Sequence, residues 1–292
     1  MYTKPTEPRS IGGVLDDGLR LWREAFAKTW ALAVMGRLMV AIPTVLLANT
    51  AVDATRLSMS QKFAIMMGGQ SQGHVWIFYL VLLASYVFHN AVLLRVAGVA
   101  ENQQTTIGGS LNKGLVLMPR LILFYIFLII GGIILGVIAV IPSVVVSMAV
   151  KSPVLVGIVV GLIFGCGSIY LAVRIFLAYI ALVVDDKPAF ESLQLSWNLT
   201  RGNWWRTTAI FTVVFIIAIV LSAAMYLLAG VFVAIWGLTS IATIAAIQVI
   251  SVLVYALLGS LYPAVLYAAF EDLKLRREGS DLVGRVNALA AQ

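Results

Sequence analysis

The chain has 292 residues, of which 61% are hydrophobic and only 11% are charged, and its mean hydropathy is +1.00. Soluble domains carry about 25% charged residues, so a chain this apolar is not a soluble globular protein, a disordered chain or a disulfide scaffold. The net charge of +7 would suit a nucleic-acid-binding protein, but the apolar excess excludes nucleic acid as a partner. The sequence predicts an all-α polytopic membrane protein that lies in a phospholipid bilayer.

Six stretches of the sequence are long and apolar enough to cross a bilayer, which takes about 20 residues in a helix. The expected spans are residues 30–49, 75–97, 121–148, 154–184, 207–235 and 241–270. An even number of spans places both termini on one side. The segments on that side carry fourteen Lys and Arg residues, whereas the opposite side carries only Arg56, Lys62 and Lys151. Because positive loops stay in the cytoplasm, both termini are expected to be cytoplasmic.

The chain contains an internal repeat. Residues 11–21 and 107–117 are identical at seven of eleven positions, and a weaker third copy starts near Pro188. Each copy predicts a cytoplasmic amphipathic helix at the membrane surface, followed by two spans. We therefore expect one membrane domain that is built from three repeats and ends in a cytoplasmic tail. The repeats cover residues 1–97, 98–184 and 185–270, and the tail covers 271–292.

Two glycines occupy the same position in the two better copies of the repeat. Gly18 and Gly114 lie on the apolar side of their expected amphipathic helices. A glycine on that side lets the backbone of a neighbouring helix approach closely. Both glycines are therefore expected to pack against the ends of neighbouring spans.

Three arginines lie inside expected spans, where a charge costs at least about 2.5–3.5 kcal/mol at the bilayer centre. Arg95 is near the end of its span, so its side chain is expected to reach the headgroups, and Arg37 either does the same or binds a ligand. Arg174 lies about ten residues from the end of the fourth span, which favours an interior polar partner or an anionic ligand. Because no acidic residue lies in any expected span, the arginines must pair with carbonyls, hydroxyls, water or a lipid phosphate.

The other polar residues at membrane depth allow two interpretations each. His89 and Asn90 either form hydrogen bonds between helices or handle a proton or substrate. Tyr170 is one of several tyrosines that line either the membrane interface or a cavity. Together with Arg37 and Arg174, these residues are the predicted ligand-binding set.

Large aromatic side chains and an arginine gather on the expected cytoplasmic amphipathic helices. The residues are Trp22, Trp197, Arg201, Trp204 and Trp205. Such helices are either stiff connectors or surfaces that contact lipid or a peripheral cytoplasmic protein. These five residues are the predicted partner surface.

The sequence offers little support for enzyme chemistry. It has only two histidines, and no His, Cys and carboxylate residues are spaced like a metal site. The adjacent acids at 185–186 and 271–272 are interpreted as turns at helix ends rather than as catalytic pairs. No glycine pattern that binds nucleotide phosphates is present. The protein is expected to be non-enzymatic, with no cofactor and no metal.

Two segments on the expected cytoplasmic side carry motifs of a known family. Residues 196–202 read Ser-Trp-Asn-Leu-Thr-Arg-Gly, and residues 272–279 read Asp-Leu-Lys-Leu-Arg-Arg-Glu-Gly. They resemble the bacterial membrane-domain family that accompanies glycerophosphoryl diester phosphodiesterases and also occurs as stand-alone six-span proteins. The resemblance implies a bacterial inner-membrane protein with a role related to glycerophospholipids. It does not imply hydrolase activity, because about 20 residues after the last span cannot form the family's phosphodiesterase barrel.

Three functions fit these observations. The first is a non-enzymatic inner-membrane protein that handles or senses lipid-like or small amphipathic molecules, with anionic lipids as its partners. The second is a secondary transporter of a small anionic solute, which internal repeats favour but the absence of an acid for ion coupling disfavours. The third is a scaffold that recruits a peripheral cytoplasmic enzyme through its exposed tryptophans. We favour the first.

Overall fold

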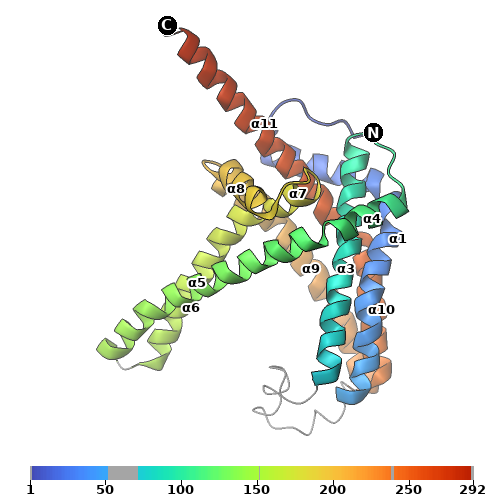
Figure 1. Cartoon of the computed structure of the whole chain (residues 1–292). Helices are drawn as coiled ribbons and strands as arrows, with labels where there is room; N and C mark the ends of the chain where they lie inside the picture. Colours follow the sequence, from blue (N-terminus) through green and yellow to red (C-terminus); the bar gives the residue numbers. More distant parts are fainter. Residues whose placement is uncertain (1, 52–71, 151, 238–239, 291–292) are drawn as a thin grey trace. The chain divides into compact units, whose positions relative to one another are not determined.

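The computed structural model describes residues 2–51, 72–150, 152–237 and 240–290, and this part of the chain forms ten helices and no strand. The helices are α1 (Ile11–Ala51), α3 (Gln72–Ala100), α4 (Ile107–Val116), α5 (Met118–Val150), α6 (Pro153–Ile175), α7 (Ala178–Val183), α8 (Ala189–Thr200), α9 (Trp204–Trp236), α10 (Ile241–Leu258) and α11 (Leu261–Ala290), as labelled in Figure 1.

Six helical segments are long and apolar enough to cross a membrane, which confirms the predicted fold class. They cover Ile11–Ile42, Leu80–Ala100, Met118–Pro142, Val154–Val183, Trp204–Trp236 and Ala242–Arg277. The chain is therefore a multi-pass helical membrane protein. The loop residues Arg56, Lys62 and Lys151 lie outside the described residues, and the orientation stays a prediction.

The helix boundaries differ from the expected ones in the first copy of the repeat. The expected amphipathic segment that begins at Ile11 and the first span form one helix, α1, because the joining residues Ala25-Phe-Ala-Lys-Thr-Trp-Ala contain no glycine or proline. In the later copies, the short helices α4 and α8 are separate. Pro119 has no N–H with which to continue α4. After α8 the chain turns at Gly202, whose φ of +82° is a conformation that glycine adopts without strain.

The described chain divides into two compact units, and α9 and α11 each contribute to both. Unit 1 contains Met1–Pro5, Arg9–Val116 and Thr212–Ala269. Unit 2 contains Thr6–Pro8, Leu117–Phe211 and Phe270–Gln292. Each unit carries one group of the predicted site residues, so each is described by itself.

Unit 1 is built on α1, which runs alongside α3 and α10 (Figure 1). Glycines bring helices of this unit into close contact. A Cβ atom added at Gly18 would lie 2.8 Å from Cα of Val265 in α11, and one at Gly114 of α4 would lie 2.8 Å from the carbonyl oxygen of Val87 in α3. Both glycines pack closely, as expected, but Gly114 meets the middle of the span in α3 and not its end. Such contacts replace the hydrophobic effect as the source of stability between helices in lipid.

Unit 2 is built on the α5–α6 hairpin, whose two helices lie side by side (Figure 1). The α8 helix contacts both helices of the hairpin and also packs on α7. Most of α7 is fully buried, including Ile180 and Leu182 at 0% exposure. The core of this unit therefore lies beneath α7 and α8, and the hairpin is largely exposed.

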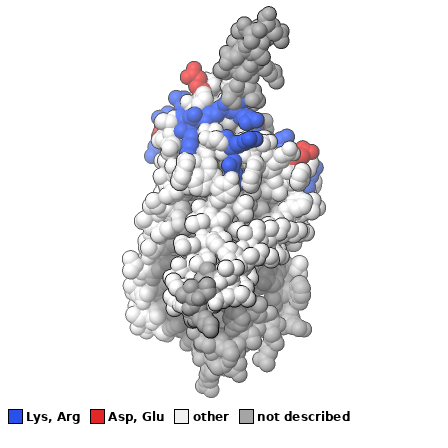
Figure 2. Space-filling view, turned by 90° about the vertical axis from the view of Figure 1, so that its left-hand side faces the viewer, with Lys and Arg blue, Asp and Glu red and all other residues white. Residues whose placement is uncertain are grey.

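The exposed hairpin surface is apolar. On α5, Ile129, Ile133 and Val137 are each about 60% exposed, which is unfavourable in water and expected where lipid chains cover the helix. On the face drawn in Figure 2, charged side chains gather at one end of the helices and the long apolar stretches are uncharged. This distribution is typical of membrane-spanning helices.

We expect Gly18→Ala to destabilise the protein and Gly12→Ala to stabilise it slightly. Both glycines lie in α1, but an added Cβ at Gly12 has no atom within 4 Å, whereas at Gly18 it meets the backbone of Val265. Overpacking costs about 1–3 kcal/mol, and exposed Gly to Ala in a helix gains up to about 1 kcal/mol. Thermal unfolding in mild detergent measures both effects. Equal midpoints for the two variants would show that the α1–α11 contact is loose.

Candidate functional site

Arg174 lies in the last turn of α6, inside the candidate span Val154–Val183. The sequence predicts about ten further residues of the fourth span after it. Instead α6 ends at Ile175, the chain turns at Phe176 and Leu177, and the remaining residues form the buried helix α7. Because that segment is covered by protein, Arg174 ends the exposed part of the hairpin. The depth of Arg174 in the membrane stays a prediction, because the candidate span Val154–Val183 continues for nine residues after it.

Two aromatic rings hold the Arg174 guanidinium. Its central carbon lies 5.3 Å from the ring centroid of Tyr170, one turn earlier on α6, and 5.0 Å from that of Trp197 on α8. Its Nη1 atom donates long hydrogen bonds to the Trp197 carbonyl oxygen at 3.3 Å and to the Thr200 hydroxyl at 3.4 Å. Ser196 ties the two helices together by donating to the Arg174 carbonyl at 2.7 Å.

The same guanidinium retains unused hydrogen-bond donors. Its Nε is buried and has no hydrogen-bond partner among the described residues, and Nη2 makes no hydrogen bond there either. Buried polar atoms in proteins are nearly always paired, so an unpaired one requires an explanation. Arginine donates two parallel hydrogen bonds to a phosphate or carboxylate through such atoms.

Two further tryptophans extend this site. Trp204 Nε1 donates to the Tyr170 carbonyl at 3.5 Å, and the rings of Trp204 and Trp205 are 4.6 Å apart. Trp205 is 80% exposed and Trp197 40% exposed. We call this set, Tyr170, Arg174, Trp197, Trp204 and Trp205, the arginine–aromatic cluster. It unites five residues that the sequence assigned to two separate groups.

The predicted residues Arg37 and His89 lie in unit 1, on helices that face α10. Arg37 of α1 donates to the Ser251 hydroxyl from Nε at 3.2 Å and from Nη2 at 3.1 Å, and from Nη2 to Oε1 of Gln248 at 3.4 Å. His89 of α3 contacts the Ser85 carbonyl through Nδ1 at 2.9 Å and the Tyr255 hydroxyl through Nε2.

These contacts assign the His89 proton and define a polar layer. Because a carbonyl only accepts, His89 donates from Nδ1 to Ser85, and Nε2 accepts from the Tyr255 hydroxyl. We call Arg37, His89, Gln248, Ser251 and Tyr255 the polar layer of unit 1. The last three follow one another at i, i+3 and i+7, the spacing of one helix face, and this signal was present in the sequence.

Four other predicted residues lie elsewhere. Asn90 donates to the Gly114 carbonyl at 3.2 Å and so faces α4, away from the contacts of His89. Trp22 of α1 donates to the Leu257 carbonyl of α10 at 3.0 Å, which is a contact between helices of unit 1. Arg201 follows α8 and is exposed, and its side chain makes no ion pair among the described residues. Arg95, expected to reach the headgroups, is instead 7% exposed.

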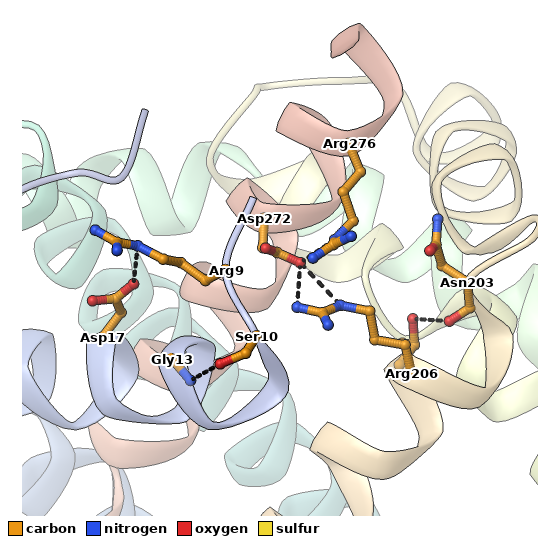
Figure 3. Close-up of polar contacts among 9 residues, drawn as sticks. Arg9, Ser10, Gly13, Asp17, Asn203, Arg206, Asp272 and Arg276 are labelled. Carbon is orange, nitrogen blue, oxygen red and sulfur yellow. Dashed lines mark hydrogen bonds and ion pairs between the residues drawn. The ribbon is translucent and has the colours of Figure 1, made fainter. Parts of the chain in front are cut away.

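Sequence reasoning missed an ionic cluster in unit 2. Asp272 was interpreted as part of a turn, but it lies inside α11, with a side chain only 1% exposed. Its Oδ2 accepts hydrogen bonds from Arg206 Nη2 and from Arg276 Nε, both at 2.9 Å. Figure 3 shows the contact between Asp272 and Arg206, with Arg276 beside it. Lys274 forms an ion pair with Asp185 at 2.7 Å. The i, i+4 spacing of Asp272 and Arg276 was the available signal.

The chain belongs to the DUF7847 family, a domain of unknown function, whose model matches residues 110–273, more than half of the chain. No curated protein matches the chain, and neither does any solved structure. The matched residues include the complete arginine–aromatic cluster and Asp272. Among the described residues, no three His, Cys, Asp or Glu side chains are placed to hold a metal ion.

We expect Asp272→Ala to destabilise the protein by about 3 kcal/mol. Removing the partner of a buried ion pair costs about 3–5 kcal/mol, and the lower end applies because both arginines are partly exposed. Asp16→Ala is the matched control, since Asp16 and Arg20 form an i, i+4 pair that is more than half exposed. It should cost under about 1 kcal/mol. Thermal unfolding compares the two; similar losses would mean that burial of Asp272 contributes nothing.

Proposed function

We propose that this protein binds an anionic phospholipid at the arginine–aromatic cluster and handles or senses such lipids as a non-enzymatic protein of the bacterial inner membrane. One observation carries the proposal. The Arg174 guanidinium contacts two aromatic rings, has no carboxylate partner among the described residues, and keeps a buried Nε without a hydrogen-bond partner there. A lipid phosphate would supply both the negative charge and the missing acceptor.

The surroundings of Arg174 favour a headgroup over a dissolved solute. Tryptophan and tyrosine concentrate at the level of lipid headgroups, where one part of the ring is apolar and another meets water. Trp197 and Trp205 are exposed beside the apolar hairpin, so the cluster has the composition of that layer. The resemblance to membrane domains that accompany glycerophosphoryl diester phosphodiesterases supports the same class of ligand.

We expect Arg174→Lys to lower the affinity for phosphatidylglycerol about tenfold and Arg174→Leu to abolish specific binding. Lysine keeps the charge but cannot donate two parallel hydrogen bonds, and leucine removes both. Native mass spectrometry of delipidated protein, titrated with phosphatidylglycerol or phosphatidylethanolamine, measures the lipid retained per chain. The unfolding midpoint should change little, because the existing hydrogen bonds of Arg174 are long.

Arg120→Leu is the matched control for this experiment. Arg120 belongs to the same unit and its partner is the exposed Asp186, so the substitution removes the same charge without touching the cluster. It should leave phosphatidylglycerol retention unchanged. If the Arg174 variants retain as much phosphatidylglycerol as the wild type, the cluster is structural and the proposed function is wrong.

The proposed orientation places both termini and the segments around α4 and α8 in the cytoplasm. Cysteines substituted for Asp17, Asn112 and Asn198, each in a Cys166→Ser background, should resist a membrane-impermeant maleimide in intact cells and react after permeabilisation. Ser152→Cys, in the turn between α5 and α6, should react in intact cells. Labelling of any of the first three from outside would overturn the orientation.

A further inference from the structure

Arg37 carries a positive charge that forms no ion pair with any described acidic residue of its unit. It lies in α1 and contacts α10, and α3 and α10 contain no Asp or Glu. The nearest acid on α1 is Glu24, thirteen residues away, or about 20 Å along the helix. All the hydrogen-bond partners of Arg37 among the described residues are neutral: the Ser251 hydroxyl and the Gln248 amide oxygen.

The polar layer also has donors left over. Arg37 uses Nε and Nη2, and Nη1 makes no hydrogen bond to the described residues. Gln248 accepts from Arg37 through its amide oxygen, which leaves the amide N–H₂ group as a donor. Ser251, only 6% exposed, donates to the Gln248 carbonyl at 2.8 Å and so presents its lone pairs to the arginine. The contacts that exist orient the guanidinium without neutralising it.

The depth of Arg37 makes this charge costly. It lies nine residues beyond the exposed Lys28, about 13 Å further along α1 and within an apolar stretch. An isolated charge near the middle of a bilayer is unfavourable, and charges found there mark pathways for ions or substrates. Phospholipid phosphates lie at the headgroup level, roughly half the hydrocarbon thickness away from the bilayer centre.

We propose that the polar layer of unit 1 binds one small dissolved monovalent anion at Arg37. The anion neutralises the guanidinium and accepts hydrogen bonds from Arg37 Nη1 and the Gln248 amide. This site is independent of the lipid site in unit 2, since the two share no residue. A transporter for small anions requires an anion site near the middle of its helices, whereas a protein that only binds lipid does not require one.

Anion-dependent unfolding tests the proposal. Purified protein is heated in sodium gluconate and in sodium chloride at equal ionic strength, with chloride varied by replacement. A ligand that binds only the folded state raises the unfolding midpoint until the site is saturated. We expect a saturable rise of roughly 3 °C or more in chloride for the wild type. No saturable rise with chloride in the wild type overturns the proposal, whatever the variants do.

The Arg37→Gln variant separates a binding role from a structural one. If Arg37 binds an anion, this variant loses the chloride response and is at least as stable as the wild type in gluconate, because an uncompensated charge has been removed. A purely structural role predicts instead that the variant loses the same number of degrees in both salts, and this result also overturns the proposal. Should Arg37→Gln fail to fold, equilibrium dialysis of the wild type with radioactive chloride must find one site per chain.

Two controls show whether the anion at Arg37 is a dissolved ion or a lipid, and distinguish this site from the lipid site at Arg174. Arg174→Leu, which removes the proposed lipid contact, should keep the full chloride response. Delipidated protein is also titrated with phosphatidylglycerol in gluconate. A stabilisation by phosphatidylglycerol that Arg37→Gln abolishes, together with no effect of chloride, would assign Arg37 to a lipid and reject the dissolved anion.

Discussion

A charge placed along an apolar helix must be matched by polar atoms, because neither lipid nor a packed helix pair solvates it. Three arginines of this chain meet that requirement with neutral partners. Arg95 donates to the Lys28 carbonyl at 2.7 Å and to the Thr105 carbonyl at 3.0 Å. Arg37 uses a hydroxyl and an amide, and Arg174 uses a carbonyl, a hydroxyl and two aromatic faces. The partners hold each guanidinium in place but leave its charge uncancelled.

The three arginines therefore differ in what remains for a ligand. Arg95 is buried, and its carbonyl partners join α3 to α1 and to the loop before α4. Its role is adequately explained by the packing of unit 1. Arg37 and Arg174 keep donors without partners among the described residues, and each stands beside side chains that suit a particular anion. The polar layer suits a small dissolved ion, and the tryptophans around Arg174 suit a headgroup.

The most buried carboxylate differs from these arginines, because it is paired with opposite charges. Asp272 is the most deeply buried acid that the structure describes, and it is held by two arginines. Such a pair joins α9 to α11 in unit 2, and its neighbour Lys274 reaches Asp185 after α7. In unit 2, buried ion pairs thus join the helix ends, whereas the ion pair of Asp16 and Arg20 in unit 1 is exposed and the helices there meet through glycine contacts and neutral hydrogen bonds. Both proposed ligands bind at an arginine, Arg37 or Arg174, that has no carboxylate partner among the described residues.

Hydropathy was enough to predict the six spans, because a bilayer demands about 20 apolar residues in each helix regardless of how the helices pack. It also singled out the arginines, since a charge in such a stretch is visible without any structure. The glycine contacts followed from the repeat, because matched glycines on an apolar face indicate a close neighbour. The helix ends were harder to predict. The α1 helix continues through an expected boundary, and α6 ends before the expected end of the fourth span.

Only the tertiary structure decided which side chains contact each predicted site residue. Tyr170 and Arg174 are one turn apart in sequence, but Trp197 reaches them because α8 folds back over the hairpin. His89 and Asn90 are adjacent, yet one contacts α10 and the other α4, since neighbouring residues on a helix point about 100° apart. The sequence by itself determined which residues are costly in a membrane; the packing of distant helices determined which atoms match them, because hydrogen bonds and ring contacts depend on distances that no spacing along one helix specifies.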